Sequence, residues 1–272
     1  MLLKVLHETT YTYNEPVRYG LLQLRLTPLN GRGQEIREWK TEIIGGKRET
    51  TNRDHFGNRV ELVRLCEDAN SVTIKSEGLV QTSDTAGILG KHYGLVPLWL
   101  FTRQTERTTP GQGIRELIQE LREQDDEREG DGDDIALLHR VSVRIRDRMA
   151  YEPGQTDSST TAEDALESGR GVCQDHSHVF LAVTRGLGFP ARYVSGYLFT
   201  ESGDDHSAGH AWAEAHLSGL GWIGFDVSNG ISPDERYVRV ARGLDSGDAA
   251  PINGIRHGDG GETMHVRLQV QQ

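Results

Sequence analysis

Short runs in which apolar and polar residues alternate fill the chain up to residue 85. Side chains along a β-strand point alternately to its two faces, so this period of two predicts half-buried strands. Pro, Gly and Asn interrupt the runs and supply turn geometry between them. We therefore expect an antiparallel, sandwich-like β-domain at the start of the chain. The five predicted strands cover residues 8–13, 21–26, 39–44, 59–65 and 72–75.

The period of two is lost over residues 98–113, and a helical period follows it. Residues 114–121 carry apolar side chains at i, i+3, i+4 and i+7, which predicts one face of an α-helix. A second helix is predicted over residues 135–149, and the acidic segment 125–134 is expected to be an exposed loop. Residues 161–164 read TAED, which resembles a helix-start capping box and predicts a further short helix.

The segment 172–187 keeps the helical period and is followed by Gly188 and Pro190, which are signals of a helix end. A group of helices followed by a run of strands is typical of an α+β domain. We place the boundary so that a β-rich N-terminal domain covers 1–105 and the α+β domain covers 106–272. The five strands predicted after the helices cover residues 191–199, 211–217, 222–227, 237–241 and 264–270.

Composition and charge exclude several classes of protein. The 272 residues include 30 Lys and Arg against 41 Asp and Glu, a formal net charge of −11, with no basic run. A surface that follows nucleic-acid phosphates needs the opposite balance, so we expect no nucleic-acid partner. No apolar stretch approaches the ~18 residues of a membrane span, and residues 1–11 lack the apolar core of a signal peptide. We expect a soluble cytoplasmic protein without a membrane partner, and we make no prediction of its oligomeric state.

Two cysteines, Cys66 and Cys173, are the candidates for thiol chemistry. Cys173 opens the helix predicted over 172–187, where unpaired backbone N–H groups and the helix dipole favour an anion. The thiolate is the reactive form of a cysteine, so this position favours a nucleophile; the alternative is a small buried core residue. Cys66 continues the apolar run of a strand, and we expect it to be structural.

A base and an orienting carboxylate for this nucleophile are found in the strands that follow. Side chains alternate along a strand, so His210 and Trp212 share one face, and the antiparallel neighbour carries Asp226 within reach of the imidazole. An imidazole takes the thiol proton, and a carboxylate fixes its tautomer and stabilises the imidazolium. The alternative is that both are polar residues at strand ends, with His206 and His216 as other candidate bases.

Cys173, His176, His178 and His210 also form a candidate set of zinc ligands, because zinc prefers Cys and His donors. Their spacing matches no standard zinc motif, and residues 176 and 178 of a helix point in different directions. The sequence contains no Gly-rich phosphate loop. We therefore expect neither a metal nor another cofactor.

Four motifs of the second domain occur in order along the chain: GVCQDHSH at 171–178, GFPARYVSGY at 188–197, GHAWAE at 209–214 and GWIGFD at 221–226. The N-terminal domain contains YTY at 11–13, LRL at 24–26 and DHFGN at 54–58. In these motifs the chain resembles the transglutaminase-like superfamily of papain-like thiol enzymes, in its bacterial branch with a β-rich N-terminal domain. The resemblance implies a papain-like core in which a helix-borne Cys173 lies against an antiparallel sheet. It also implies that Cys173 is the nucleophile, His210 the base and acid, and Asp226 the orienting group.

Other residues near these motifs are candidates for the cleft or its support. We place Gln174 and Asp175 at the rim, and His178 in the core or behind the catalytic residues. Trp212 is expected in the core, with a substrate platform as the alternative. Residues 227–230 read VSNG where relatives carry Pro and Thr, and the usual aromatic-bearing stretch downstream reads RGLDSGD, so the cleft wall is expected to differ from theirs.

The expected reaction is acyl transfer from a peptide or isopeptide amide to Cys173, with formation of a thioester. We expect water to resolve the thioester more readily than an amine, although the acidic, Gly-rich segment 243–261 is a candidate rim for cationic amines. The alternatives are a protein-glutamine or other amide transglutaminase, and a non-catalytic interaction module that retains the fold. The N-terminal domain is expected to carry no chemistry and to pack beside the cleft. The backbone N–H of Cys173 is one candidate oxyanion donor, and no sequence signal locates a second.

Overall fold

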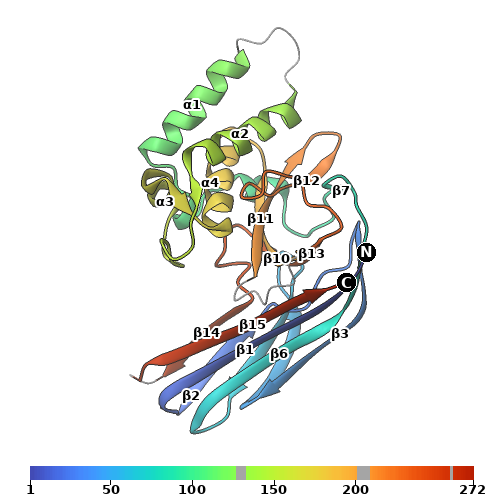
Figure 1. The fold of residues 1–272 in the computed structure, drawn as a ribbon, viewed down its shortest axis with the longest axis vertical. Helices are drawn as coiled ribbons and strands as arrows, with labels where there is room; N and C mark the ends of the chain where they lie inside the picture. Colours follow the sequence, from blue (N-terminus) through green and yellow to red (C-terminus); the bar gives the residue numbers. More distant parts are fainter. Residues whose placement is uncertain (127–132, 201–208, 258–259) are drawn as a thin grey trace.

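The computed structural model describes residues 1–126, 133–200, 209–257 and 260–272. Two four-stranded antiparallel sheets form a sandwich at one end of the molecule (Figure 1). One sheet has the order β15–β1–β6–β3 and the other β14–β2–β5–β4, and apolar side chains of β1, β2, β5 and β6 pack between them. The bounds are β1 (Leu2–Val17), β2 (Tyr19–Leu24), β3 (Gln34–Ile44), β4 (Gly46–Arg53), β5 (Arg59–Leu65), β6 (Ala69–Thr82), β14 (Ile252–His257) and β15 (Glu262–Gln271).

A third antiparallel sheet, of order β13–β10–β11–β12–β7, lies between the sandwich and the helices (Figure 1). Helix α4 packs on β10 and β11, and α1, α2 and α3 surround α4. Residues 179–183 of α4 are fully buried in the core that these elements share. The bounds are β7 (Ile88–Gly90), α1 (Gln112–Asp126), α2 (Asp134–Arg148), β8 (Ala150–Tyr151), α3 (Ala162–Ser168), β9 (Arg170–Gly171), α4 (Cys173–Gly186), β10 (Ala191–Leu198), β11 (His210–Leu217), β12 (Gly221–Phe225) and β13 (Tyr237–Gly243).

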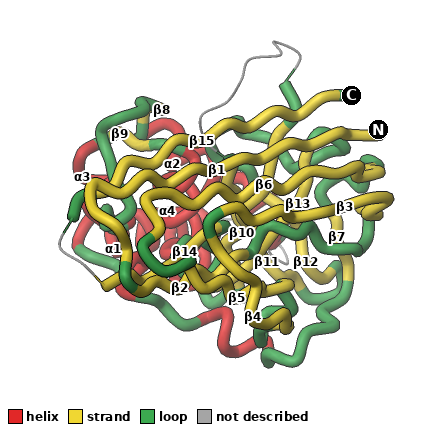
Figure 2. Tube along the Cα trace, turned by 90° about the horizontal axis from the view of Figure 1, so that it is seen from below, coloured by secondary structure: helices red, strands yellow, loops and turns green. Residues whose placement is uncertain are grey.

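Strand pairing crosses the boundary expected between residues 105 and 106 in both directions. β14 and β15 come from the end of the chain and pair with β2 and β1, so the two termini lie side by side (Figure 2). β7 precedes the boundary and pairs with β12. The strand predicted over 264–270 is therefore present but belongs to the sandwich, where it covers an edge of β1 that would otherwise be open. The division at residue 105 stays a prediction.

The predicted helices are confirmed, with differences at their ends. α1 and α2 both extend into the acidic segment expected as a loop, of which residues 127–132 lie outside the described part. Asp133 caps α2 by accepting two N–H groups of its first turn. The TAED segment does start α3, because the Thr161 hydroxyl accepts the Asp164 N–H at 3.2 Å. α4 ends before Gly188, whose φ of 100° is a backbone conformation that glycine adopts readily and other residues rarely adopt.

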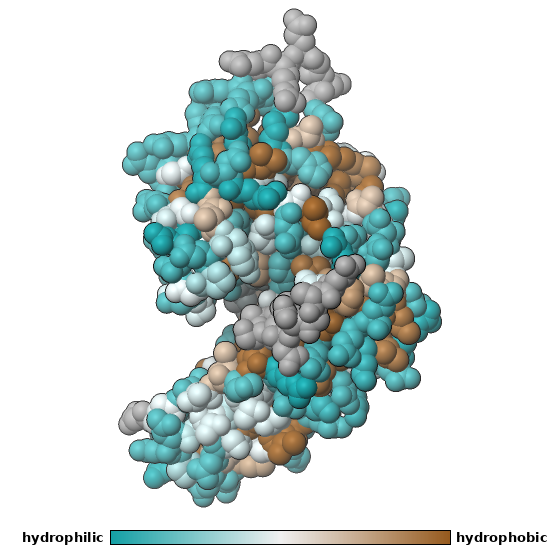
Figure 3. All heavy atoms as spheres, in the orientation of Figure 1, coloured by the Kyte–Doolittle hydropathy of each residue, from teal (hydrophilic) through white to brown (hydrophobic). Residues whose placement is uncertain are grey.

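The sandwich and the third sheet share an apolar contact. Leu3, Val5 and Leu268 of the sandwich pack with Tyr197 and Val238 of β10 and β13. The surface in Figure 3 is largely hydrophilic and is hollowed between the helical lobe and the sandwich. Among the described residues, no helix is long and apolar enough to cross a membrane.

Candidate active site

Cys173 is the first residue of α4, and buried contacts hold the chain that leads to it. The Asp175 carboxylate turns back and accepts the Val172 N–H at 2.8 Å, while the Thr156 hydroxyl donates to it at 2.6 Å. A Cβ atom at Gly171 would lie 2.7 Å from that carboxylate, so this position needs glycine. These contacts fix the first turn of α4 and with it the half-buried Cys173.

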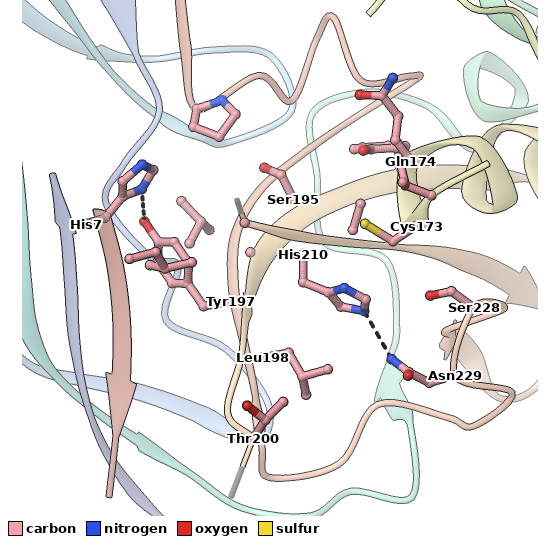
Figure 4. Close-up of a pocket in the computed structure, with 18 of the residues that line it drawn as sticks. His7, Cys173, Gln174, Ser195, Tyr197, Leu198, Thr200, His210, Ser228 and Asn229 are labelled. Carbon is pink, nitrogen blue, oxygen red and sulfur yellow. Dashed lines mark hydrogen bonds between the residues drawn. The ribbon is translucent and has the colours of Figure 1, made fainter. Parts of the chain in front are cut away.

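His210 opens β11 and presents its imidazole to Cys173 (Figure 4). Its Nε2 atom lies 2.6 Å from Oδ2 of Asp226, which directly follows β12. The antiparallel register of β11 and β12 brings Asp226 to the start of β11. Because Nε2 is engaged by Asp226, Nδ1 is the nitrogen that faces the sulfur. The three residues expected from the sequence therefore lie together, in the order thiol, imidazole, carboxylate.

Asp226 is buried and accepts hydrogen bonds from four residues. Besides His210, the Tyr237 hydroxyl and the Asn229 side-chain amide donate to Oδ2, each at 2.7 Å. The Ser228 hydroxyl donates to Oδ1 at 2.8 Å, and the Asn229 backbone N–H donates to the same atom at 3.2 Å. The VSNG segment thus supplies two of the residues that hold the carboxylate in place.

These contacts also set the charge of the pair. Burial alone would lower the pKa of His210, but hydrogen bonding to Asp226 and interaction with Cys173 outweigh it and raise the pKa to about 10. Burial would raise the pKa of Asp226, but the hydrogen bond and charge of His210, with Asn229 and Tyr237, hold it well below its usual range. An imidazolium is therefore favoured at neutral pH, and its positive charge lies beside the sulfur of Cys173.

Two groups at this cavity, the backbone N–H of Cys173 and the hydroxyl of Tyr151, are candidate hydrogen-bond donors to an oxyanion. The Cys173 N–H lies in the first turn of α4, where backbone N–H groups have no acceptor within the helix. Tyr151 lines the same cavity from β8. Burial, followed by the charges of Cys173 and Asp226, raises the pKa of the Tyr151 hydroxyl, which therefore stays protonated and able to donate.

A cavity of about 700 Å³ opens in front of Cys173, where the sandwich meets the third sheet. His7 of β1 and Leu268 of β15 contribute to one wall, and Tyr197 of β10 lies beside them. His7 donates to or accepts from the Tyr197 hydroxyl at 2.9 Å, and burial lowers its pKa to about 4, so it is neutral. No Asp, Glu, Lys or Arg is found among the described residues that line this cavity.

Known proteins match both halves of the chain. Residues 119–227 match the family model of the transglutaminase-like superfamily, and residues 3–81 match that of the bacterial transglutaminase-like N-terminal region. An uncharacterized protein of Mycobacterium tuberculosis (strain H37Rv) is 30% identical over 274 residues, which cover 93% of this chain and 86% of that protein. The chain belongs to the transglutaminase-like superfamily.

Two further similar proteins match this superfamily member over different shares of its chain. The crystal structure of a Cytophaga hutchinsonii protein, named as a proposed cysteine protease, aligns with a TM-score of 0.76 at 23% identity. The alignment covers 100% of this chain and 91% of that one, so the two share a fold. A protein-glutamine gamma-glutamyltransferase of Pseudomonas aeruginosa is 27% identical over 142 residues, which cover 45% of this chain and 20% of that enzyme.

The other candidates at the superfamily site have different positions. Gln174 lines the cavity, as expected of the rim, whereas Asp175 is 1% exposed and holds the helix start instead. Trp212 is buried, with its ring 6.2 Å from that of His210 and 5.4 Å from that of Tyr237. It therefore supports the imidazole and does not line the cavity of Cys173.

The two other histidines of the zinc alternative are occupied inside the protein. The ring nitrogens of His176 lie 3.0 Å from the Val172 carbonyl oxygen and 3.3 Å from that of Met149. His178 is buried, which lowers its pKa to about 4, and its Nε2 accepts the Ser246 N–H at 3.2 Å. Neither histidine lines the cavity of Cys173.

The prediction for Cys66 was wrong about its surroundings. β5 ends at Leu65, and the Cys66 that follows is exposed, so the apolar run does not carry it into the core. Of the alternative bases, His216 packs against Trp222 and does not line the cavity of Cys173, and His206 lies outside the described residues.

Four residues at the site were not predicted: Tyr151, Ser228, Asn229 and Tyr237. Ser228 and Asn229 follow Asp226 directly, and short polar side chains after an Asp often bond within the same turn, so a local signal was present. Tyr151 and Tyr237 are brought to the site by the pairing of β8 with β9 and of β10 with β13. No local pattern marks them.

Proposed function

We propose that this protein is a thiol-dependent acyl-transfer enzyme that cleaves peptide or isopeptide amides through a thioester on Cys173. Membership of the transglutaminase-like superfamily and the fold shared with the Cytophaga hutchinsonii protein support a cysteine-based enzyme. The observation that carries the proposal is the arrangement at one wall of the cavity. There, His210 contacts Cys173 on one side and lies 2.6 Å from Asp226 on the other.

The geometry suits each proton transfer of the reaction. The proton that His210 carries on Nδ1 is the one taken from the thiol, and the Cys173 sulfur attacks the amide carbonyl carbon to give a tetrahedral oxyanion. The Cys173 N–H and the Tyr151 hydroxyl donate to that oxygen. The imidazolium returns its proton to the leaving nitrogen as the C–N bond breaks, which leaves a thioester and a free amine. His210 then deprotonates water, which attacks the thioester, and the sulfur leaves with the proton.

Two observations support water over an amine as the acceptor. The acidic segment 243–261 was a candidate rim, yet Asp245 packs near Arg107 and Ser246 contacts His178 behind the cavity. β14, from the same segment, belongs to the sandwich. Among the described residues of segment 243–261, Pro251 lines the cavity. The described lining therefore lacks a carboxylate that would gather cationic amines.

A protein-glutamine transferase is the second candidate. The partial similarity to the Pseudomonas aeruginosa protein-glutamine gamma-glutamyltransferase favours it, because that match includes part of this chain's catalytic half. The same thioester serves both outcomes, and the choice depends on which acceptor reaches it. A non-catalytic module of the same fold is the third reading, and it predicts no turnover with any acceptor.

One experiment separates these readings. The purified protein is incubated with a glutamine-containing peptide library, with and without a millimolar lysine-like amine, and products are identified by mass spectrometry. We expect free acids and cleaved peptides to exceed amine adducts, and Cys173→Ala to form neither. A majority of amine adducts would assign the transferase function. If no product forms in either condition, the protein is a non-catalytic module.

The proposal includes a peptide or protein substrate, with neither nucleic acid nor a membrane as partner, and a cytoplasmic location. The described cavity lining contains no Asp, Glu, Lys or Arg, which supports a peptide segment without such side chains at the cysteine. Fractionation of cells that express the chain tests the location, which is contradicted if the protein is recovered outside the cytoplasm.

A further inference from the structure

A second cavity, of about 510 Å³, lies on the other face of the third sheet. Tyr193 and Ser195 of β10 line the cavity of Cys173, whereas Arg192 and Val194 line this one, as expected for alternating side chains. Loops of the sandwich close it from one side and β7 from another. The two cavities share no lining residue.

The lining of this second cavity is basic in a protein whose net charge is −11. Three arginines form its floor, and Glu214 is the one carboxylate among the described lining residues. Four more cations line its rim, and all four are exposed. The floor residues are Arg192, Arg239 and Arg242, and the rim residues are Arg32, Arg53, Arg59 and Lys91.

Glu214 cannot neutralise the floor by itself. It is 1% exposed and accepts from Nε of Arg192 at 2.6 Å, while a nitrogen of Arg239 lies 3.9 Å from its other oxygen. Burial together with the charge of Arg192 lowers the pKa of Arg242 to about 10, which indicates repulsion between the guanidinium groups. Three guanidinium groups face one carboxylate in the described lining, so the floor retains an excess of positive charge, and buried charge without a partner is costly.

Two of the floor arginines donate hydrogen bonds to backbone carbonyl oxygens, but these bonds do not neutralise their positive charge. Arg239 donates to the Arg32 carbonyl oxygen at 2.9 Å, and Arg242 donates to that of Phe56 at 2.7 Å. These bonds tie sandwich loops to the third sheet, yet a carbonyl oxygen neutralises no charge. Two acidic residues outside the lining are already shared with other arginines. Asp54, whose charge acts on Arg242, pairs with Arg25, and Glu61 pairs with both Arg48 and Arg59.

We propose that this basic cavity binds a small, multiply charged anion that carries phosphate or carboxylate groups. Guanidinium groups bind both kinds of anion through paired hydrogen bonds, and a recessed site strengthens each of them. The volume suits a small molecule, and Arg192 is held in place at the floor by its hydrogen bond to Glu214 and by stacking on Trp222, with its Cζ 3.9 Å from the ring centre. The site is independent of the chemistry proposed for Cys173.

Calorimetric titration of the full chain with inorganic pyrophosphate, and separately with citrate, tests the proposal. We expect saturable binding of one anion per chain with a Kd below about 1 mM at low ionic strength. Binding of pyrophosphate alone assigns a phosphate ligand, and binding of citrate alone assigns a carboxylate ligand. Absence of saturable binding for both anions in this range would overturn the proposal.

Variants of the rim locate the binding. Within the described residues, the side chains of Arg32 and Lys91 are exposed and make no hydrogen bond or ion pair, so their loss leaves the fold intact. The pair Arg32→Gln and Lys91→Gln should raise the Kd about tenfold. The matched pair Arg37→Gln and Lys47→Gln removes the same charge from exposed sandwich positions outside the cavity and should leave the Kd within about twofold.

Equal effects of the two pairs would refute binding in this cavity. Cys173→Ala separates the proposal from the catalytic one, because the anion should bind this variant as it binds the wild type. Loss of anion binding in Cys173→Ala would place the anion at the other cavity and overturn the proposal.

Discussion

Replacement of Asp226 by Asn removes a charge from the most densely bonded carboxylate of the site. Its Oδ2 atom accepts three donors at 2.6–2.7 Å, from His210, Asn229 and Tyr237. An amide either points its NH₂ group at these three donors or turns that group toward the Ser228 hydroxyl and the Asn229 N–H. Each orientation leaves donors facing donors, and each leaves the imidazolium without its counter-charge.

The expected losses follow from the burial of this pair. The side chains of His210 and Asp226 are 14% and 0% exposed, so the pair is poorly screened by solvent. Breaking a buried ion pair by removing one partner costs about 3–5 kcal/mol, which lowers the free energy of unfolding without abolishing folding of an average domain. Loss of the orienting carboxylate should lower kcat about a thousandfold to ten-thousandfold, with residual activity remaining.

Asp226→Asn is compared with Asp234→Asn, a matched change on the same loop. Asp234 is bonded to Arg236 near the surface, and its loss should leave kcat within about twofold. Initial rates on a peptide amide give kcat, and urea unfolding gives stability. If Asp226→Asn keeps kcat within tenfold of the wild type and has an unchanged unfolding midpoint, the carboxylate does not orient the imidazole and our reading of the site is wrong.

Three further predictions concern the same site. Cys173→Ala and His210→Ala should abolish turnover almost equally because they act as one unit, and His216→Ala should retain it, as initial-rate measurements will show. Tyr151→Phe should lower kcat about a hundredfold with little change in KM if its hydroxyl stabilises the oxyanion, and equal kcat values would exclude that role. The pKa of His210, raised from 6.5 to about 10, gives stability that is complete below pH 6.5 and lost as the pH rises through 10. The difference in unfolding free energy between wild type and His210→Ala should therefore shrink over that range, and a difference that grows with pH would contradict the charged pair.

Much of the fold could be predicted from local patterns, because long elements bury one face. The helix that starts at Cys173 and the strands around it carry this pattern clearly. β4 was missed because its residues are almost all polar and exposed, and β14 because a Gly interrupts its apolar positions. The pairing of β14 and β15 with the sandwich is a long-range contact, which no local pattern encodes.

Part of the candidate site could likewise be predicted from local sequence, and part of it depends on long-range contacts. Cys173, His210 and Asp226 lie in distinctive local sequences, and the structure brings them together. Tyr151 and Tyr237 reach the site through strand pairing, so their place depends on tertiary structure. The basic cavity could not be predicted from the sequence either, because its arginines are spread over five segments that meet when the sandwich packs on the third sheet.

The central claim, that Cys173 is an activated nucleophile, is tested most directly by mapping alkylation with limiting iodoacetamide at about pH 6. Cys66 is an exposed internal control in the same chain, and ordinary thiols are less than about 1% thiolate at this pH. The account predicts that Cys173 is labelled well before Cys66, and that His210→Ala removes the preference. Equal labelling of both cysteines in the wild type, or labelling of Cys173 only after unfolding, would contradict it.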